Sequence, residues 1–307
     1  MTSFVLRRLM SAVPTIFIVV TISFFLMRFA PGGPFNLERP LPPQTMANIM
    51  ATYKLDQPLI SQYLSYIGNA VTGDLGPSFI YKDNTVAELI GKALPYSVQL
   101  GSMAILIALI GGVLLGTIAA LRQNSVLDFG LMAFATVGVT VPNFVVGPVL
   151  TLVFAVILSW LPAGGWGDGS LQFLILPIIA LALPQLAVFA RLTRGAMIEA
   201  LHTDHIRTAK AYGLPSRVVV ITHALRGAML PVVSYLAPCA AALLTGSAVV
   251  ESIFTIPGVG RYFVLGALNR DYPLVMGTVI LVAIFVIVFN LLVDIAYGLL
   301  DPRVRHD

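Results

Sequence analysis

The feature that most constrains this chain is a series of long apolar stretches that hold no Asp, Glu, Lys or Arg. A helix needs about 20 apolar residues to cross the hydrocarbon core of a bilayer. Six stretches reach about that length, and each is rich in Leu, Ile, Val, Ala and Phe. They cover residues 9–27, 97–121, 129–160, 171–190, 227–250 and 272–293. The sequence therefore predicts an all-α, polytopic membrane protein with six transmembrane helices.

The composition excludes an ordinary soluble domain. Of 307 residues, 58% are hydrophobic and 10% are charged, whereas soluble domains carry about 25% charged residues. The net charge of +4 lies at the ends of the apolar stretches and not in one patch, so we expect no nucleic-acid partner. The third stretch is longer than a span needs and contains Pro142 and Pro148, so we expect it to be kinked there or to start later.

The distribution of Lys and Arg predicts the orientation. With the N-terminus inside, the cytoplasmic segments hold eleven Lys and Arg, and the outer segments hold six. Arg28 lies at the outer end of the first span. Because basic residues favour the cytoplasmic side, we expect both termini to be cytoplasmic.

We expect four segments along the chain. Residues 1–30 are the cytoplasmic N-terminus and first span, 31–96 an extracytoplasmic segment with amphipathic helices, 97–303 the core with the other five spans and the loop at 197–226, and 304–307 a cytoplasmic tail. Pro58 opens an amphipathic pattern in the second segment. Its expected apolar face consists of Leu59, Ile60, Tyr63, Leu64, Ile67 and Val71.

The cytoplasmic loop at residues 197–226 is predicted to contain a short helix with defined ends. Thr203 or Asp204 can cap its start. Gly213 supplies a C-terminal stop, and Pro215 follows just beyond it. Ser216 can then cap a second helical stretch that runs into the fifth span. A helix of about nine residues is roughly 13 Å long.

No catalytic pattern is present, so we expect no catalytic residues and no enzyme activity in this chain. The phosphate loop of ATP-binding proteins is absent, as are the HExxH, CxxC and GxSxG patterns. His202 and His205 could share a helix face, but zinc sites normally recruit three or four ligands. We therefore expect no metal site and no cofactor in this chain.

The predicted spans also lack the ionisable groups that secondary transporters use as relays. Glu251 and Asp294 lie at span edges, where water or backbone groups can hold them. A secondary transporter or channel and a membrane-embedded enzyme remain alternatives, but neither has a supporting motif. A transporter without ion-coupling groups needs a partner that supplies energy, and the capped helix of the loop is a plausible receiver.

Uncharged polar residues within the spans are candidates for a transport pathway. They could equally serve as hydrogen-bonding groups between helices. The candidates are Thr136, Thr140, Asn143, Ser234, Tyr235, Thr245 and Ser247.

The cytoplasmic loop resembles the EAA loop of bacterial ABC importer permeases. That family pattern is Glu-Ala-Ala, three residues and Gly, with a spacer to an Ile-x-Leu-Pro sequence. Here Arg207 and Thr208 replace the first two residues, Ala209 and Gly213 match, and the spacer to Leu230-Pro231 is longer. Both departures are similar to the peptide-permease branch. The segments at residues 41–49 and 76–83 resemble those of oligopeptide permease B subunits.

The resemblance implies a permease of the bacterial inner membrane that imports oligopeptides. Dipeptide, glutathione and nickel permeases share the frame and remain alternatives. Implied partners are a homologous second permease, two ATPase subunits that bind ATP and Mg, and an extracytoplasmic peptide-binding protein. The ATPase-coupling residues would be Asp204, Arg207, Thr208, Ala209, Lys210 and Gly213. An outer gate or binding-protein contact would include Glu251, Arg261, Arg270 and Asp271.

Overall fold

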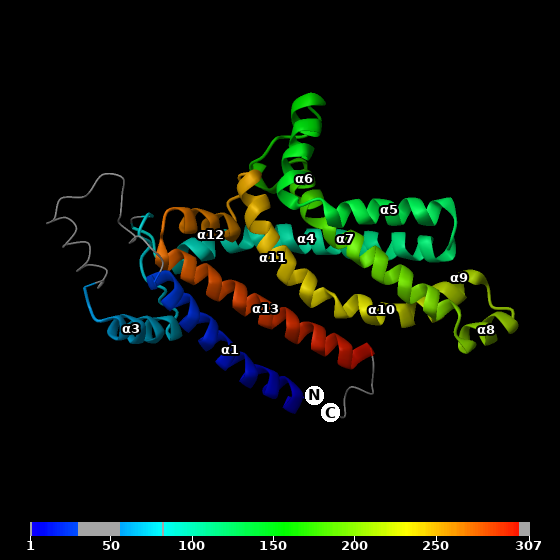
Figure 1. Cartoon of the computed structure of the whole chain (residues 1–307), viewed down its shortest axis with the longest axis horizontal. Helices are drawn as coiled ribbons and strands as arrows, with labels where there is room; N and C mark the ends of the chain where they lie inside the picture. The colour runs from blue at the N-terminus through cyan, green and yellow to red at the C-terminus, as the bar shows by residue number, and fades with distance from the viewer. Residues whose placement is uncertain (1, 30–55, 82, 301–307) are drawn as a thin grey trace.

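The computed structural model describes residues 2–29, 56–81 and 83–300, without the side chains of residues 2–9, 244–246, 294 and 296–300. All named elements of these residues are helices, which confirms the all-α prediction. Figure 1 shows an elongated bundle. We call one end the α8 end, after α8 (Asp204–Ala211), and the other the α12 end, after α12 (Val259–Leu268). The start of α1 (Thr2–Phe29) and the end of α13 (Tyr272–Leu300) both point toward the α8 end.

The centre of the bundle is the pair α4 (Val86–Leu121) and α7 (Leu171–Leu201), which pack along much of their length. Small residues allow this close approach. A Cβ atom at Gly112 would overlap the Cβ of Phe189, and one at Gly116 would overlap the carbonyl oxygen of Ala190. Because lipid tails compete poorly with such backbone contacts, small residues spaced four apart favour tight helix association.

The start of α4 lies well before the apolar stretch that predicted it. Thr85 and Glu88 form a capping box, in which Glu88 N donates to Thr85 Oγ1 at 3.2 Å and Thr85 N donates to Glu88 Oε2 at 3.1 Å. Such a box satisfies two backbone donors that the helix start leaves open. The helix therefore extends eleven residues before the apolar stretch at 97–121.

The third apolar stretch is broken, as the two prolines predict. It forms α5 (Val126–Thr140), α6 (Asn143–Leu150) and the π-helical turn η1 (Thr151–Ile157). The bend of 105° lies between α5 and the continuous segment α6–η1. Val141 is extended, with φ −84° and ψ 119°. A proline disfavours helical geometry in the residue before it, so Pro142 explains the break. In Figure 1, α6 stands away from the rest of the bundle.

The fifth predicted span, at residues 227–250, consists of two helices, so the prediction of one continuous helix there is wrong. After α9 (Ser216–Val218) and the π-helical turn η3 (Val219–Ala224), the chain forms α10 (Leu225–Ser234) and α11 (Leu236–Ile253). Pro238 has no N–H to donate to the carbonyl of Ser234, so the helical ladder is interrupted there.

Within residues 2–29, 56–81 and 83–300, the count of six helices able to span a membrane is confirmed, although its members differ from the prediction. The bent pair α5 and α6–η1 could form a seventh span. The six are Met10–Phe29, Val86–Leu121, Leu171–Leu201, Ser216–Ser234, Leu236–Ile253 and Tyr272–Val293.

The amphipathic helix α3 (Leu59–Val71) forms where Pro58 predicts it, and half of its expected apolar face is covered: Leu59, Tyr63 and Ile67 are half-buried. Tyr63 packs against Phe24 of α1, with ring centroids 5.4 Å apart, and its hydroxyl lies 2.7 Å from Thr21 Oγ1. Ile60 and Leu64 of the expected face are exposed. The aromatic side chains thus determine which side of α3 meets α1.

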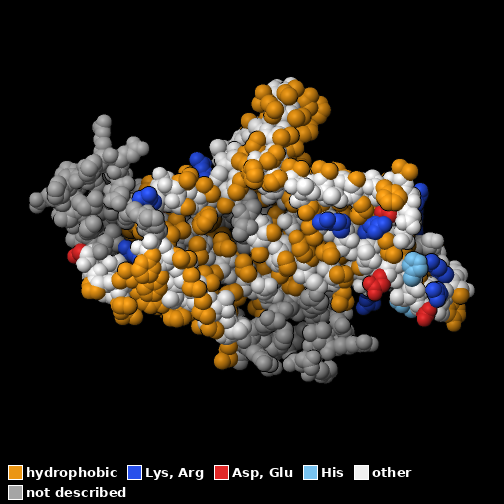
Figure 2. All heavy atoms as spheres, viewed as in Figure 1, with side chains coloured by type: hydrophobic (Ala, Val, Ile, Leu, Met, Phe, Trp, Pro, Cys, Tyr) orange, Lys and Arg blue, Asp and Glu red, His pale blue; other side chains and the backbone are white. Residues whose placement is uncertain are grey.

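The surface agrees with a membrane-spanning chain. Figure 2 shows hydrophobic side chains over the middle of the bundle, with Lys, Arg, Asp and Glu gathered toward its two ends. This distribution is expected when lipid tails surround the middle of the bundle and water surrounds its ends.

Candidate functional site

The helix predicted in the basic loop is α8, and a glycine terminates it as expected. Thr203 occupies the N-cap position, but its hydroxyl donates to Ala200 O at 2.6 Å instead of capping α8. At the other end, Leu214 N donates to Ala209 O at 3.3 Å and Gly213 N donates to Lys210 O at 3.0 Å. These two bonds define a Schellman motif. Gly213 has a φ of +76°, a left-handed conformation that favours glycine.

One face of α8 packs into the chain. Ile206 and Ala209 are buried against Met197 of α7 and against Val219 and Ala224 of η3. Ala209, predicted to couple to an ATPase, therefore lies on the inward face. This apolar cluster packs α8 against η3 and against Met197 of α7.

The opposite face of α8 is exposed and basic. Arg207, Thr208 and Lys210 are exposed, and Arg207 Nη1 lies 3.2 Å from Asp204 Oδ1 in a surface ion pair. Tyr212 follows the helix with 83% of its surface exposed. Sequence reasoning did not single out Tyr212. An aromatic residue directly before the terminal glycine, in a water-facing loop, was the available signal.

A buried ion pair joins two helices at the same end. Arg194 of α7 donates from Nε to Asp128 Oδ1 at 2.6 Å and from Nη2 to Asp128 Oδ2 at 2.7 Å. Asn124 N also donates to Asp128 Oδ2, at 2.9 Å. Asp128 is 1% exposed and the Arg194 side chain 27%, so the loss of Arg194 would leave a buried charge without compensation. Sequence reasoning missed this pair because its members are 66 residues apart.

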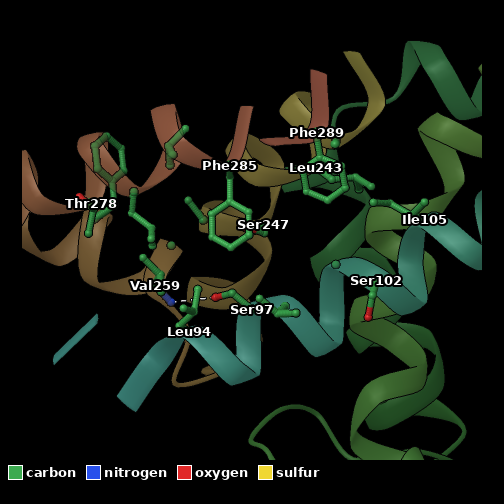
Figure 3. A pocket seen from close by; sticks show the side chains of 18 of the residues that line it. Leu94, Ser97, Ser102, Ile105, Leu243, Ser247, Val259, Thr278, Phe285 and Phe289 are labelled. Carbon is green, nitrogen blue, oxygen red and sulfur yellow. Dashed lines mark hydrogen bonds between the residues drawn. The ribbon is translucent and has the colours of Figure 1, made fainter. Parts of the chain in front are cut away.

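A cavity of about 520 Å³ lies between α4, α11, α12 and α13. Figure 3 shows Ser97 and Ser102 on α4, with Ser247, Thr278 and Phe285 on the facing helices. Most of the lining is apolar. Ser247 is the one predicted pathway residue among those that line this cavity.

The other predicted pathway residues lie at separate places in the described structure. Thr136 and Thr140 are exposed on α5, and each donates to a carbonyl one turn earlier in its own helix, at 2.8 Å. Ser234 donates to Leu230 O at 2.7 Å, and Tyr235 OH donates to Gln185 Oε1 of α7 at 2.9 Å. Asn143 begins α6 and is half-buried, and the side chain of Thr245 lies outside the described residues. A role for this set in lining a pathway stays a prediction.

At the α12 end, Glu251 is fully buried and holds three elements together. Its Oε1 accepts from Ser97 of α4 at 2.8 Å, and its Oε2 accepts from Arg261 N of α12 at 3.1 Å. A Cβ atom at Gly258 would overlap the Glu251 carboxylate. Glu251 therefore lies at a helix end, beside the cavity, and its side chain accepts hydrogen bonds from hydroxyl and backbone groups.

Asp271 is also fully buried and binds the loop before α4. It accepts hydrogen bonds from Ser78 Oγ, from Phe79 N at 3.2 Å and from Leu274 N at 3.3 Å at the start of α13.

Arg270 precedes Asp271, is exposed and has a φ of +58°. A contact of this corner with a partner protein stays a prediction, and the side chain of Asp294 lies outside the described residues.

These features define a polytopic helical membrane protein with a membrane cavity and one anchored, exposed helix at one end. Residues 112–306 match the family described as binding-protein-dependent transport system inner membrane component. Residues 1–101 match the N-terminal family of binding-protein-dependent transport system membrane components. The chain belongs to this family.

Its relatives match it over the whole length. The chain is 52% identical over 306 residues to the oligopeptide transport system permease protein OppB of Salmonella typhimurium and to OppB of Escherichia coli, with complete coverage of both chains. It is 44% identical to the dipeptide transport system permease protein DppB of Bacillus subtilis, over 99% of this chain and 98% of the relative.

Proposed function

We propose that this chain is the membrane-spanning permease subunit of an ATP-driven importer of oligopeptides in a bacterial inner membrane. The observation that carries the proposal is the full-length 52% identity to oligopeptide permeases, together with α8 at the position of the EAA loop. The α8 end would face the cytoplasm. A dipeptide importer is the second candidate, and the lower identity of 44% to DppB makes it less favoured.

The proposed partners follow from what the chain lacks. Its sequence has no phosphate-binding loop, so two cytoplasmic ATPase subunits would bind ATP and Mg and hydrolyse the nucleotide. A homologous second permease would complete the pathway, and an extracytoplasmic binding protein would deliver the peptide. This chain would then be a non-catalytic subunit.

The geometry of α8 supports its role as the docking element. Its outward face presents Arg207, Lys210 and Tyr212 to the solvent, which suits an acidic groove with an apolar pocket. Its inward face is fixed to Met197 of α7 by Ile206. Since α7 packs closely on α4, an ATPase that moves α8 would move the central helix pair with it.

Purification and reconstitution test this function. The expected result is a stable complex with ATPase subunits, and ATP hydrolysis that an oligopeptide stimulates only when the binding protein is present. Peptide transport by the isolated chain along a proton gradient, without any ATPase, would contradict the proposal.

A further inference from the structure

A second cleft, of about 260 Å³, lies on the α12 end beside α1 and away from the cavity of Figure 3. It is bounded by the end of α1, by α3, by the loop at residues 74–79 and by the start of α13. Its polar lining includes Arg28, Ser65, Tyr66, Asn69 and Asp74. A polar cleft at the end of a membrane span has the composition of a ligand site and not of a lipid-tail contact.

Arg28 is the cationic group of this cleft. Its guanidinium carbon lies 5.3 Å from the ring centroid of Phe24 and 6.0 Å from that of Tyr272. Among residues 2–29, 56–81 and 83–300, no carboxylate and no hydrogen-bond acceptor pairs with this guanidinium. Two aromatic rings stabilise a cation only partly, so a half-buried arginine at this depth favours an external anion.

Tyr66 provides a hydrogen-bond donor in the same cleft. Its hydroxyl oxygen is buried and has no partner within the described part of the chain. Burial raises the pKa of Tyr66, so the hydroxyl keeps its proton. A buried hydroxyl without a partner loses the hydrogen bonds it would make in water, and an anionic oxygen in the cleft would restore one.

Asp74 adds a negative charge to the rim of the cleft. Its Oδ1 accepts from Gly76 N at 2.9 Å, which holds the carboxylate in a tight turn. Asp74 forms no ion pair with Arg28, so the cleft presents one cation and one anion that do not neutralise each other directly. This pairing is complementary to a zwitterion whose phosphate meets Arg28 and whose ammonium meets Asp74.

We propose that this cleft binds a phospholipid with a phosphoethanolamine headgroup, in the leaflet at the α12 end. Arg28 is the penultimate residue of the span Met10–Phe29, which is the depth at which lipid phosphates lie. Leu26 of α1 and Leu64 of α3 are 66% and 63% exposed, so other faces of the two helices that bound the cleft offer apolar surface to acyl chains. The lipid joins α1 and α3 to α13.

Native mass spectrometry of the full chain with its co-purified subunits tests the proposal. The probes are phosphatidylethanolamine, phosphatidylglycerol and diacylglycerol with identical acyl chains, soluble phosphoethanolamine, and tri-alanine. We expect one phosphatidylethanolamine molecule to be retained most tightly. Diacylglycerol and soluble phosphoethanolamine should bind at least tenfold more weakly, because each lacks one half of the ligand.

Four variants assign the contacts. Arg28→Gln and Tyr66→Phe should each weaken retention of phosphatidylethanolamine, Arg28→Gln at least tenfold and Tyr66→Phe severalfold. Asp74→Asn keeps an oxygen for Gly76 N and removes only the charge, so it should abolish the preference over phosphatidylglycerol. Lys92→Gln, an exposed cation on α4 outside the cleft, is the matched control and should retain the lipid as the wild type does.

Three results would overturn the proposal. The first is equal retention by the wild type, Arg28→Gln and Tyr66→Phe, where Tyr66→Phe is mild enough to fold. The second is a wild-type preference for phosphatidylglycerol or diacylglycerol. The third is displacement of the lipid by tri-alanine, which would identify the cleft as a peptide site.

Discussion

At the α12 end, Glu251 and Asp271 are fully buried and accept hydrogen bonds from backbone and hydroxyl groups of their own chain. At the α8 end, Arg207 and Lys210 are exposed on a helix whose other face is buried. The carboxyl groups at the α12 end take their hydrogen bonds from within the chain, whereas the basic side chains at the α8 end remain available to a partner. The contrast supports the proposal that a partner docks at the α8 end, while hydrogen bonds within the chain hold the α12 end together.

The largest expected effect is the loss of peptide uptake in Gly213→Pro. Proline fixes φ near −65°, whereas Gly213 has a φ of +76° and donates to Lys210 O. The end of α8 would be rebuilt without any change in a span, so the amount of chain in the membrane should stay normal. Gly213→Asn is the control, because Asn tolerates this conformation. Normal uptake by Gly213→Pro would sink the assignment of α8 as the coupling element.

Asp128→Ala should be the next largest change, and it acts on stability. It removes the acceptor of two charge-assisted hydrogen bonds from Arg194 and of one from Asn124 N, at a combined cost of about 3 kcal/mol. Equilibrium unfolding in detergent measures the effect. The double variant Asp128→Leu with Arg194→Met should recover most of the loss, since it removes both charges. An unchanged unfolding midpoint in Asp128→Ala would mean that the pair does not hold α5 to α7.

Glu251→Ala should loosen the α12 end alone. Ser97 and Arg261 N would lose their carboxyl acceptor, at a cost of about 1–3 kcal/mol. Hydrogen exchange in lipid nanodiscs should rise at residues 258–268 and stay unchanged at residues 204–211. Equal protection of both segments in the variant and the wild type would remove Glu251 as the anchor of α12.

Asp204→Asn should have the smallest effect. The side chains of Asp204 and Arg207 are 94% and 71% exposed, and exposed pairs contribute little to stability. Unfolding of the variant should match that of the wild type within error. A clear destabilisation would indicate that the exposed face of α8 contributes to the fold as well as to docking.

The sequence predicted the features whose signals are local. Charge-free stretches located most of the spans but not Ser216–Ser234, Pro142 located the 105° bend, and Gly213 located the end of α8. These residues act through their own backbone, so no distant partner is needed to interpret them.

The features that sequence reasoning missed depend on distant partners. Asp128 is buried because Arg194 lies opposite it, and Glu251 turns inward because the loop around Gly258 wraps it. The half of the apolar face of α3 that is covered depends on Phe24 of α1, which Tyr63 contacts. A stripe of small residues at Gly112 and Gly116 was readable as a packing signal, but its partner α7 was not.

Site-specific photo-cross-linking tests the central claim most directly. A photoreactive amino acid replaces Tyr212 at the α8 end or, as the control, Leu268 at the α12 end, which is 75% exposed. In intact cells, we expect the probe at position 212 to link the chain to an ATPase subunit, and the probe at position 268 to give no such product. No ATPase adduct from position 212, or an equal yield from position 268, would contradict the claim that α8 receives the motion of the ATPase.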